Sequence, residues 1–156
     1  LSLSSGVIIA GILLYWSFSQ YFLWRNDESL AKYLLPPNQS IGYFINYVFF
    51  RFWASYAASL LIGLIFFAIT RYFNKKHEEK FFHAEEPYIL AAAIFLTGHP
   101  LWLFYLAAVL TLWFLILIFR KNKRFSFYYF WLPAAILVIL LKGPLMNLGF
   151  LRALQF

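Results

Sequence analysis

The acidic and imidazole side chains that could do chemistry are few, and most of them lie in one short segment. Residues 77–86 read HEEKFFHAEE, and Glu79, His83 and Glu86 stand at positions i, i+4 and i+7, on one face if the segment is helical. Imidazole and carboxylate groups so arranged could bind zinc or a pair of metal ions. The spacing is not the HExxH motif, and Lys80 lies among the acids. We therefore predict a solvated charged loop without metal or cofactor, and a metal site is the alternative.

His99 is a titratable side chain in an otherwise apolar stretch, between Gly98 and Pro100. Neighbouring Gly and Pro residues predict a turn. An ionisable group at membrane depth is a candidate functional site, whereas a neutral imidazole at a turn near the interface costs little free energy. We expect a turn residue and keep a functional role as the alternative.

Other motifs of catalysis and binding are absent from the sequence. The chain has no cysteine, which excludes disulfides, thiolate metal sites and cysteine nucleophiles. It has no Gly-x-Ser-x-Gly turn, no phosphate-binding loop and no dinucleotide fingerprint. The apolar stretches carry no ladder of Asp, Glu or Arg side chains, so a channel or a transporter is disfavoured.

The composition indicates which elements must position these residues. Apolar residues make up 63% of the 156 and charged residues 12%, with a mean hydropathy of +0.72, whereas soluble domains carry about 25% charged residues. A soluble chain of this size must cover a large surface with polar groups, so we predict that lipid solvates this one. The net charge of +7 comes from cations that flank apolar runs. Cations in such positions orient a chain in the membrane, so we predict no nucleic-acid partner.

The apolar runs predict an all-α, multi-pass transmembrane bundle that forms one domain over residues 1–156. About 20 residues cross a bilayer core of about 30 Å. We expect about five spans, within a range of four to six. The first is read as a retained helix rather than a signal peptide, because no basic region precedes it and no cleavage site follows. The predicted segments are Gly6–Trp24, part of Tyr43–Phe73, Tyr88–Gly98, Leu101–Phe119 and Tyr128–Leu141.

Two of these segments have unusual lengths. Tyr43–Phe73 is too long for one upright span. Its interior is apolar apart from the charged residue Arg51, and Arg71 lies near its end. We favour an interfacial helix before Arg51 and a span from Phe52, and one long tilted helix is the alternative. Tyr88–Gly98 covers about half of the bilayer core, so it either borrows flanking residues or forms a re-entrant hairpin.

The cations predict an orientation in a bacterial-type cytoplasmic membrane. Loops 74–87 and 120–127 would be cytoplasmic, and residues 25–42 would face outward. Eight of the thirteen cations follow the second and fourth predicted spans: Arg71, Lys75, Lys76, Lys80, Arg120, Lys121, Lys123 and Arg124.

Small residues on the second span predict close helix packing. Ser55, Ser59 and Gly63 recur at every fourth position, and Ala54 and Ala58 lie beside them. In lipid, small side chains let helix backbones approach closely. The row serves either packing within the chain or packing against a partner subunit.

The segment AEEPYILAAAIFLTG, residues 84–98, resembles the acid-led helix of the prepilin peptidase family of intramembrane aspartyl proteases. There a Gly-Asp motif begins a short Leu- and Ala-rich helix that ends at Gly. The basic loop after Leu101–Phe119 and the segment Phe125–Pro133 also look like that family. The resemblance covers about the C-terminal half of the chain and implies two catalytic carboxylates, which share a proton.

The motif that carries this resemblance is degenerate. Glu85 or Glu86 stands at the position of the aspartate, and Phe82 and His83 stand at those of the preceding glycines. Glu86 would be one acid and Asp27 the other, yet the predicted topology puts them on opposite sides of the membrane.

The leading prediction for function is a non-catalytic membrane subunit or assembly factor of a larger complex. Its partners would be the lipid bilayer and neighbouring membrane subunits. The alternative is a prepilin-peptidase-like protease, or an inactive relative of one.

Overall fold

The computed structural model describes residues 2–26, 30–77, 82–119 and 128–147. Every regular element in these ranges is helical, so the predicted all-α class is confirmed. The elements are α1 (Ser2–Asn26), η1 (Leu30–Leu34), α2 (Ile41–Val48), η2 (Phe49–Trp53), α3 (Ala54–Lys76), α4 (Glu86–Thr97), α5 (Trp102–Phe119), α6 (Tyr128–Leu140) and α7 (Lys142–Met146).

The chain divides into two compact units, one formed by residues 1–55 and the other by residues 56–155. Each unit has its own cluster of buried apolar residues. That residues 1–156 form a single membrane domain stays a prediction.

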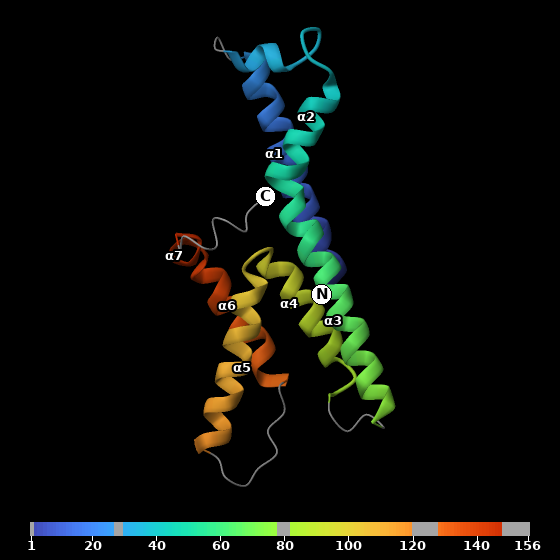
Figure 1. Ribbon diagram of the computed structural model, residues 1–156, viewed down its shortest axis with the longest axis vertical. Helices are drawn as coiled ribbons and strands as arrows, with labels where there is room; N and C mark the ends of the chain where they lie inside the picture. Colours follow the sequence, from blue (N-terminus) through green and yellow to red (C-terminus); the bar gives the residue numbers. More distant parts are fainter. Residues whose placement is uncertain (1, 27–29, 78–81, 120–127, 148–156) are drawn as a thin grey trace. The chain divides into compact units, whose positions relative to one another are not determined.

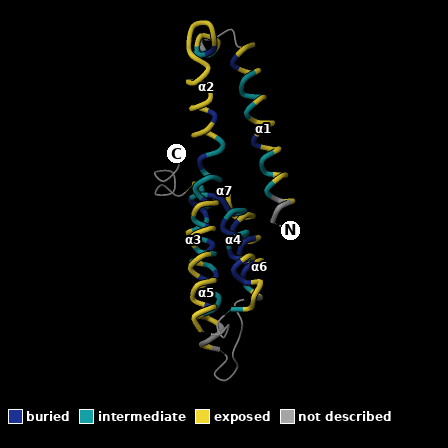
Figure 2. The backbone as a smooth tube through the Cα atoms, turned by 90° about the vertical axis from the view of Figure 1, so that its right-hand side faces the viewer, coloured by how far each residue is buried: buried dark blue, intermediate teal, exposed yellow. Residues whose placement is uncertain are grey.

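The first unit is held together by aromatic packing between α1 and the start of the next long helix. Trp24 of α1 meets Phe44 of α2 edge-on, with ring centroids 5.3 Å apart. Farther along, the Trp53 indole donates a hydrogen bond of 3.2 Å to Ser17 Oγ, which itself donates to Leu13 O at 2.7 Å. Away from these contacts, α1 and α2 are largely exposed (Figure 2).

The helix that begins at α2 is unbroken from Ile41 to Lys76, a length of 36 residues. Our favoured division into two helices at Arg51 is therefore wrong. No Gly or Pro lies between Tyr43 and Tyr56 to end the helix, and the π-helical turn η2 carries Arg51 instead of a break. A π-turn inserts an extra residue without ending the helix.

The core of the second unit surrounds the short helix α4. Figure 1 shows α4 beside α5 and α6, and these three helices make the main contacts of the unit. Pro87 in the first turn of α4 suits a helix start, and Gly98, at φ 73°, ends the helix in a conformation that favours glycine. The buried core residues are Leu90, Ala93, Ile94, Leu101, Tyr105, Val109, Trp131, Ala134, Ala135 and Val138.

Two helices in the described part of the chain are long and apolar enough to cross a membrane, Gly6–Asn26 and Ile41–Lys76. Three further apolar helical stretches are shorter: Glu86–Thr97, Trp102–Leu115 and Tyr129–Leu140. These helices agree with the predicted membrane protein, and the number of spans stays a prediction.

Candidate functional site

Glu86, the first residue of α4, is a buried acid, with 1% of its surface exposed. Its Oε1 accepts a hydrogen bond of 3.2 Å from the His83 backbone N–H. The Glu86 N–H in turn donates to the His83 carbonyl at 3.0 Å. This exchange resembles one half of a capping box, in which an acidic side chain reaches back three residues to a free N–H.

The second carboxylate oxygen of Glu86 connects α4 to α6. Its Oε2 accepts a hydrogen bond of 3.1 Å from the Trp131 indole N–H, across 45 residues of sequence. Trp131 is itself buried in the core of the unit. Hydrogen bonds to an ionised group are about twice as strong as neutral ones, so the two donors compensate part of the cost of burying a carboxylate.

Asn74, near the end of α3, fixes the segment that leads into this site. Its Nδ2 donates to the Phe82 carbonyl at 2.9 Å, and the Phe82 N–H donates to its Oδ1 at 3.1 Å. The buried amide thereby satisfies both backbone groups of Phe82, as a neighbouring strand would. We call Asn74, Phe82, His83, Glu86 and Trp131 the Glu86 junction, which links α3, α4 and α6.

The geometry of the Glu86 junction is that of a structural link. Catalysis of the aspartyl type needs two carboxylates that share a site. Among the residues that the structure describes, the other acid is Glu85, which is exposed in the turn before α4. Asp27, the predicted second acid, lies outside the described residues.

The predicted metal-binding face is not formed at His83. This residue lies outside any helix and is exposed, whereas Glu86 is buried at the start of α4. Phe82, His83 and the turn that follows interrupt the helical spacing on which the face depended. Glu79 lies outside the described residues, and those that are described contain no group of three His, Cys, Asp or Glu side chains able to hold a metal ion.

His99 lies at the turn between α4 and α5 and is partly buried. Its Nδ1 accepts a hydrogen bond of 3.1 Å from the indole N–H of Trp102, three residues later. The imidazole thus contacts the first turn of α5, a local role that agrees with a turn residue.

Two members of the small-residue row contact α4 within the second unit. Ser59 is fully buried, and its hydroxyl donates to the Tyr56 carbonyl at 3.1 Å and to the Phe95 carbonyl at 3.5 Å. A Cβ placed on Gly63 would lie 2.9 Å from the Ala91 carbonyl oxygen. These contacts are of the internal kind, one of the two roles predicted for the row.

The other small residues lie along the same helix. Ala54 is buried and Ser55 half-buried, both in the first unit, and Ala58 is half-buried in the second.

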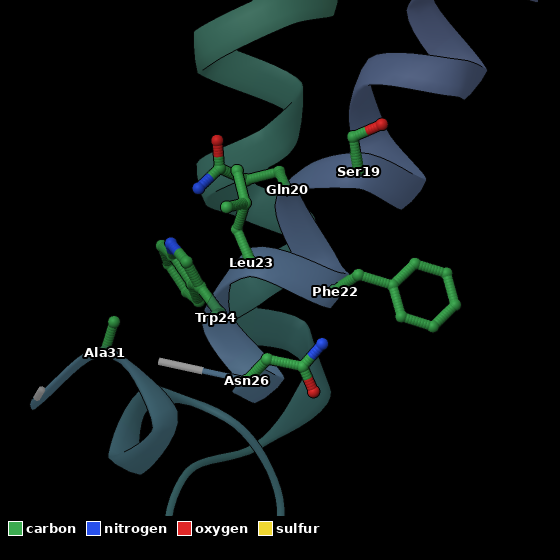
Figure 3. Close-up of a pocket in the computed structure, with 7 residues that line it drawn as sticks. All are labelled: Ser19, Gln20, Phe22, Leu23, Trp24, Asn26 and Ala31. Atoms are coloured by element: carbon green, nitrogen blue, oxygen red, sulfur yellow. The ribbon is translucent and has the colours of Figure 1, made fainter. Parts of the chain in front are cut away.

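Among the residues that the structure describes, polar or charged side chains line a cavity in each unit. In the second unit, a cavity of about 410 Å³ is lined by Arg71, Asn74, Lys75, Ala84, Pro87 and Tyr88. In the first unit, an open cavity of about 800 Å³ lies along the end of α1 (Figure 3). There Gln20, Leu23 and Trp24 point to one side of α1, and Phe22 points to the other.

Sequence reasoning missed two other members of the Glu86 junction, Asn74 and Trp131. Asn74 is a lone amide at the end of a long apolar helix, and Trp131 is one of several aromatic residues near the start of α6. Neither position carries a motif, so the signal for Asn74 was its polarity alone and Trp131 had none.

Comparisons with protein-family models, with curated proteins and with solved structures found no match for this chain.

Proposed function

We propose that the protein is a multi-pass membrane subunit or assembly factor that performs no catalysis itself. The observation that carries this proposal is the exposed apolar surface of α1, along which large side chains face outward from Val7 to Leu23. A water-soluble monomer rarely exposes an apolar surface of this extent. Lipid tails or the helices of a neighbouring subunit would cover it. These side chains include Val7, Ile8, Tyr15, Phe18, Phe22 and Leu23.

The proposed topology has five membrane segments. The span Gly6–Asn26 covers about 31 Å at 1.5 Å per residue. The helix Ile41–Lys76 is about 54 Å long, so it would cross from about Phe52 to Phe73, with Arg51 at the outer headgroups. Helix α4, at 12 residues and about 18 Å, would enter the membrane without crossing it alone, and α5 and α6 would complete the bundle.

The lack of catalysis is inferred from the Glu86 junction. Both carboxylate oxygens of Glu86 already accept hydrogen bonds from the chain itself. A general acid or base must be free to contact the substrate or a reacting water. This carboxylate instead stabilises the start of α4.

A role as a subunit is supported by small open positions on α1. A Cβ added to Gly6 or Gly11 would meet no heavy atom within 4 Å. Glycines on a membrane helix allow the backbone of another helix to approach closely. In the described structure these two positions remain available to a second polypeptide.

The test is purification in a mild detergent followed by native mass spectrometry. We expect a stoichiometric companion protein that Gly11→Leu displaces, because leucine would block close approach on α1. Leu14→Ile, an exposed position on the same helix, is the control that should keep the companion. A lone monomer, with no companion in any mild detergent, would contradict the proposal.

A prepilin-peptidase-like enzyme is the second candidate, and one observation favours it. Glu86 begins a short helix that ends at Gly98, in the manner that the resemblance implies. An active enzyme of this type requires Asp27 on the same side of the membrane as Glu86.

The sidedness of Asp27 separates the two candidates. The chain has no cysteine, so Asp27→Cys would be the single site labelled by a membrane-impermeant maleimide. Labelling from the outside in intact cells would exclude the protease, and labelling after permeabilisation alone would exclude the proposed topology.

A further inference from the structure

The cavity between the end of α3 and the start of α4 combines charge with an adjoining apolar surface. Arg71 and Lys75 stand four residues apart, so both lie on one face of α3. Asn74, Pro87 and Tyr88 line the same cavity of about 410 Å³.

Arg71 and Lys75 bring two positive charges to the lining of the cavity. No acidic residue lines it in the part of the chain that the structure describes. Glu86 is next to Pro87 in sequence, but its carboxylate accepts hydrogen bonds from His83 and Trp131 and is buried. Glu85 is exposed and does not line the cavity. Among the residues that the structure describes, two cations and no carboxylate line this space, which suits an anion.

Aromatic rings limit the positions of these groups. The Arg71 guanidinium lies 5.8 Å from the centre of the Phe67 ring. The Tyr88 ring lies 4.9 Å from the same ring. Cation–π and ring contacts reduce the freedom of both side chains, so less entropy is lost when they bind a ligand.

The surface next to the cavity is apolar. Leu64, Phe67 and Arg71 follow at helical spacing along one face of α3, and Leu64 is 54% exposed. A ligand held at Arg71 would therefore have hydrocarbon surface directly beside it. A soluble phosphate compound would make no apolar contact with this surface, whereas the acyl chain of a lipid would pack against it.

We propose that this cavity binds the phosphate of an anionic glycerophospholipid, with an acyl chain lying along Phe67 and Leu64. This inference rests on the membrane location in the proposed function. Arg71 offers a planar fork for two phosphate oxygens, and Lys75 adds a point charge. The Tyr88 hydroxyl can donate to a third oxygen.

The location also agrees with the predicted orientation. Arg71 and Lys75 lie at the end of the helix assigned to the cytoplasmic face, where anionic lipids attract basic residues. The site would hold one such lipid at the junction of α3 and α4.

The test uses the full chain in nanodiscs of neutral phosphatidylcholine that contain a small fraction of phosphatidylglycerol. Bound lipid is counted by native mass spectrometry after ejection from the discs. We expect one retained phosphatidylglycerol per chain, with affinity about five-fold weaker in Lys75→Gln and in Arg71→Gln.

Lys76→Gln is the matched control, because it removes the same charge one residue away, at an exposed position that does not line the cavity. Ala84→Glu keeps both cations and places a carboxylate in the cavity, so it should weaken binding at least as much as Lys75→Gln. Far-ultraviolet circular dichroism of each variant tests whether it is folded.

Three results would overturn the proposal. Equal binding by the Lys75→Gln and Lys76→Gln proteins would show a diffuse surface charge rather than a site. Equal retention of phosphatidylcholine would remove the requirement for an anion. Displacement of the lipid by millimolar inorganic phosphate would assign the cavity to a soluble phosphate. All three leave the search for a companion protein unaffected, so the two proposals fail separately.

Discussion

At the scale of single residues, the Glu86 junction shows how hydrogen bonds from two different parts of the chain hold a buried carboxyl group. Glu86 accepts one hydrogen bond from a backbone N–H and one from an indole N–H. The hydrogen bonds hold the start of α4 against α6. The junction therefore predicts that changes to Glu86 act on stability.

Glu86→Gln should lower the free energy of unfolding by about 2 kcal/mol, because the amide group would face one of the two donors with a donor of its own. Trp131→Phe should cost a similar amount, since it removes the indole donor from a buried oxygen of Glu86. Titration of the protein in mixed micelles with a denaturing detergent would measure both changes.

The double variant measures the coupling energy between Glu86 and Trp131 directly. Because the two residues share one hydrogen bond, Glu86→Gln with Trp131→Phe should cost about 1 kcal/mol less than the two single changes added together. Strict additivity would mean that the bond between Glu86 and Trp131 does not contribute to stability.

Tyr105 presents the opposite case, a buried polar group without a partner. It is fully buried in α5, and its hydroxyl has no hydrogen-bond partner in the described structure. Tyr105→Phe should raise the free energy of unfolding by about 1 kcal/mol, because it removes a hydroxyl that is buried without compensation.

Tyr72→Phe is the control, because Tyr72 is 66% exposed and the loss of its hydroxyl should change stability by less than about 0.5 kcal/mol. Thermal unfolding in the same detergent compares the two. A destabilised Tyr105→Phe protein would mean that the hydroxyl has a partner, such as a buried water.

At the scale of the elements, the approach of α3 to α4 depends on one glycine. The backbone of Gly63 lies so close to Ala91 that a methyl group would meet its carbonyl oxygen at 2.9 Å. A backbone oxygen cannot move aside as a flexible side chain can, so the two helices would have to separate.

Gly63→Ala should therefore destabilise the protein by about 1–3 kcal/mol. Gly11→Ala in α1 is the matched control, because its Cβ meets nothing within 4 Å and alanine favours a helix by about 0.5–1 kcal/mol. Opposite signs for the two changes are the expected outcome of the unfolding titration. Equal effects would mean that helix propensity, not packing, decides both.

Helix positions were largely predictable from the sequence, because apolar runs and their Gly and Pro boundaries are local signals. The end of α4 at Gly98 and the range of α6 follow the prediction closely. The long helix did not follow the prediction, because the charge of Arg51 was taken to divide a helix that no Gly or Pro interrupts. The π-turn at Arg51 itself has no sequence signature comparable to Pro or Gly.

The partners in the site were less predictable than the helices. Glu86 stood out as an acid beside an apolar run, but its contact with Trp131 spans 45 residues. Such a contact depends on how α4 and α6 pack, which periodicity within either helix does not encode. The pairing of Asn74 with Phe82 crosses only eight residues, yet it depends on a turn without a recognisable motif.

At the scale of the whole molecule, the proposed topology makes a prediction that single cysteines can test. The natural chain contains none, so each introduced cysteine is labelled without background. Asn38, before the helix Ile41–Lys76, His77, directly after it, and Lys142, after α6, are all exposed. If that helix crosses the membrane once and residues 77–87 are cytoplasmic, Asn38 and His77 must lie on opposite sides.

A membrane-impermeant maleimide should therefore label Asn38→Cys and Lys142→Cys in intact cells, and His77→Cys only after permeabilisation. Lys142 shares the side of Asn38 because α4 and α5 together return the chain to the cytoplasmic side and α6 then crosses outward. Labelling of Asn38→Cys and His77→Cys from the same side would refute a single crossing by the long helix. Labelling of Lys142→Cys from the cytoplasm would instead leave that crossing intact and show that α6, with its 13 residues, turns back within the bilayer.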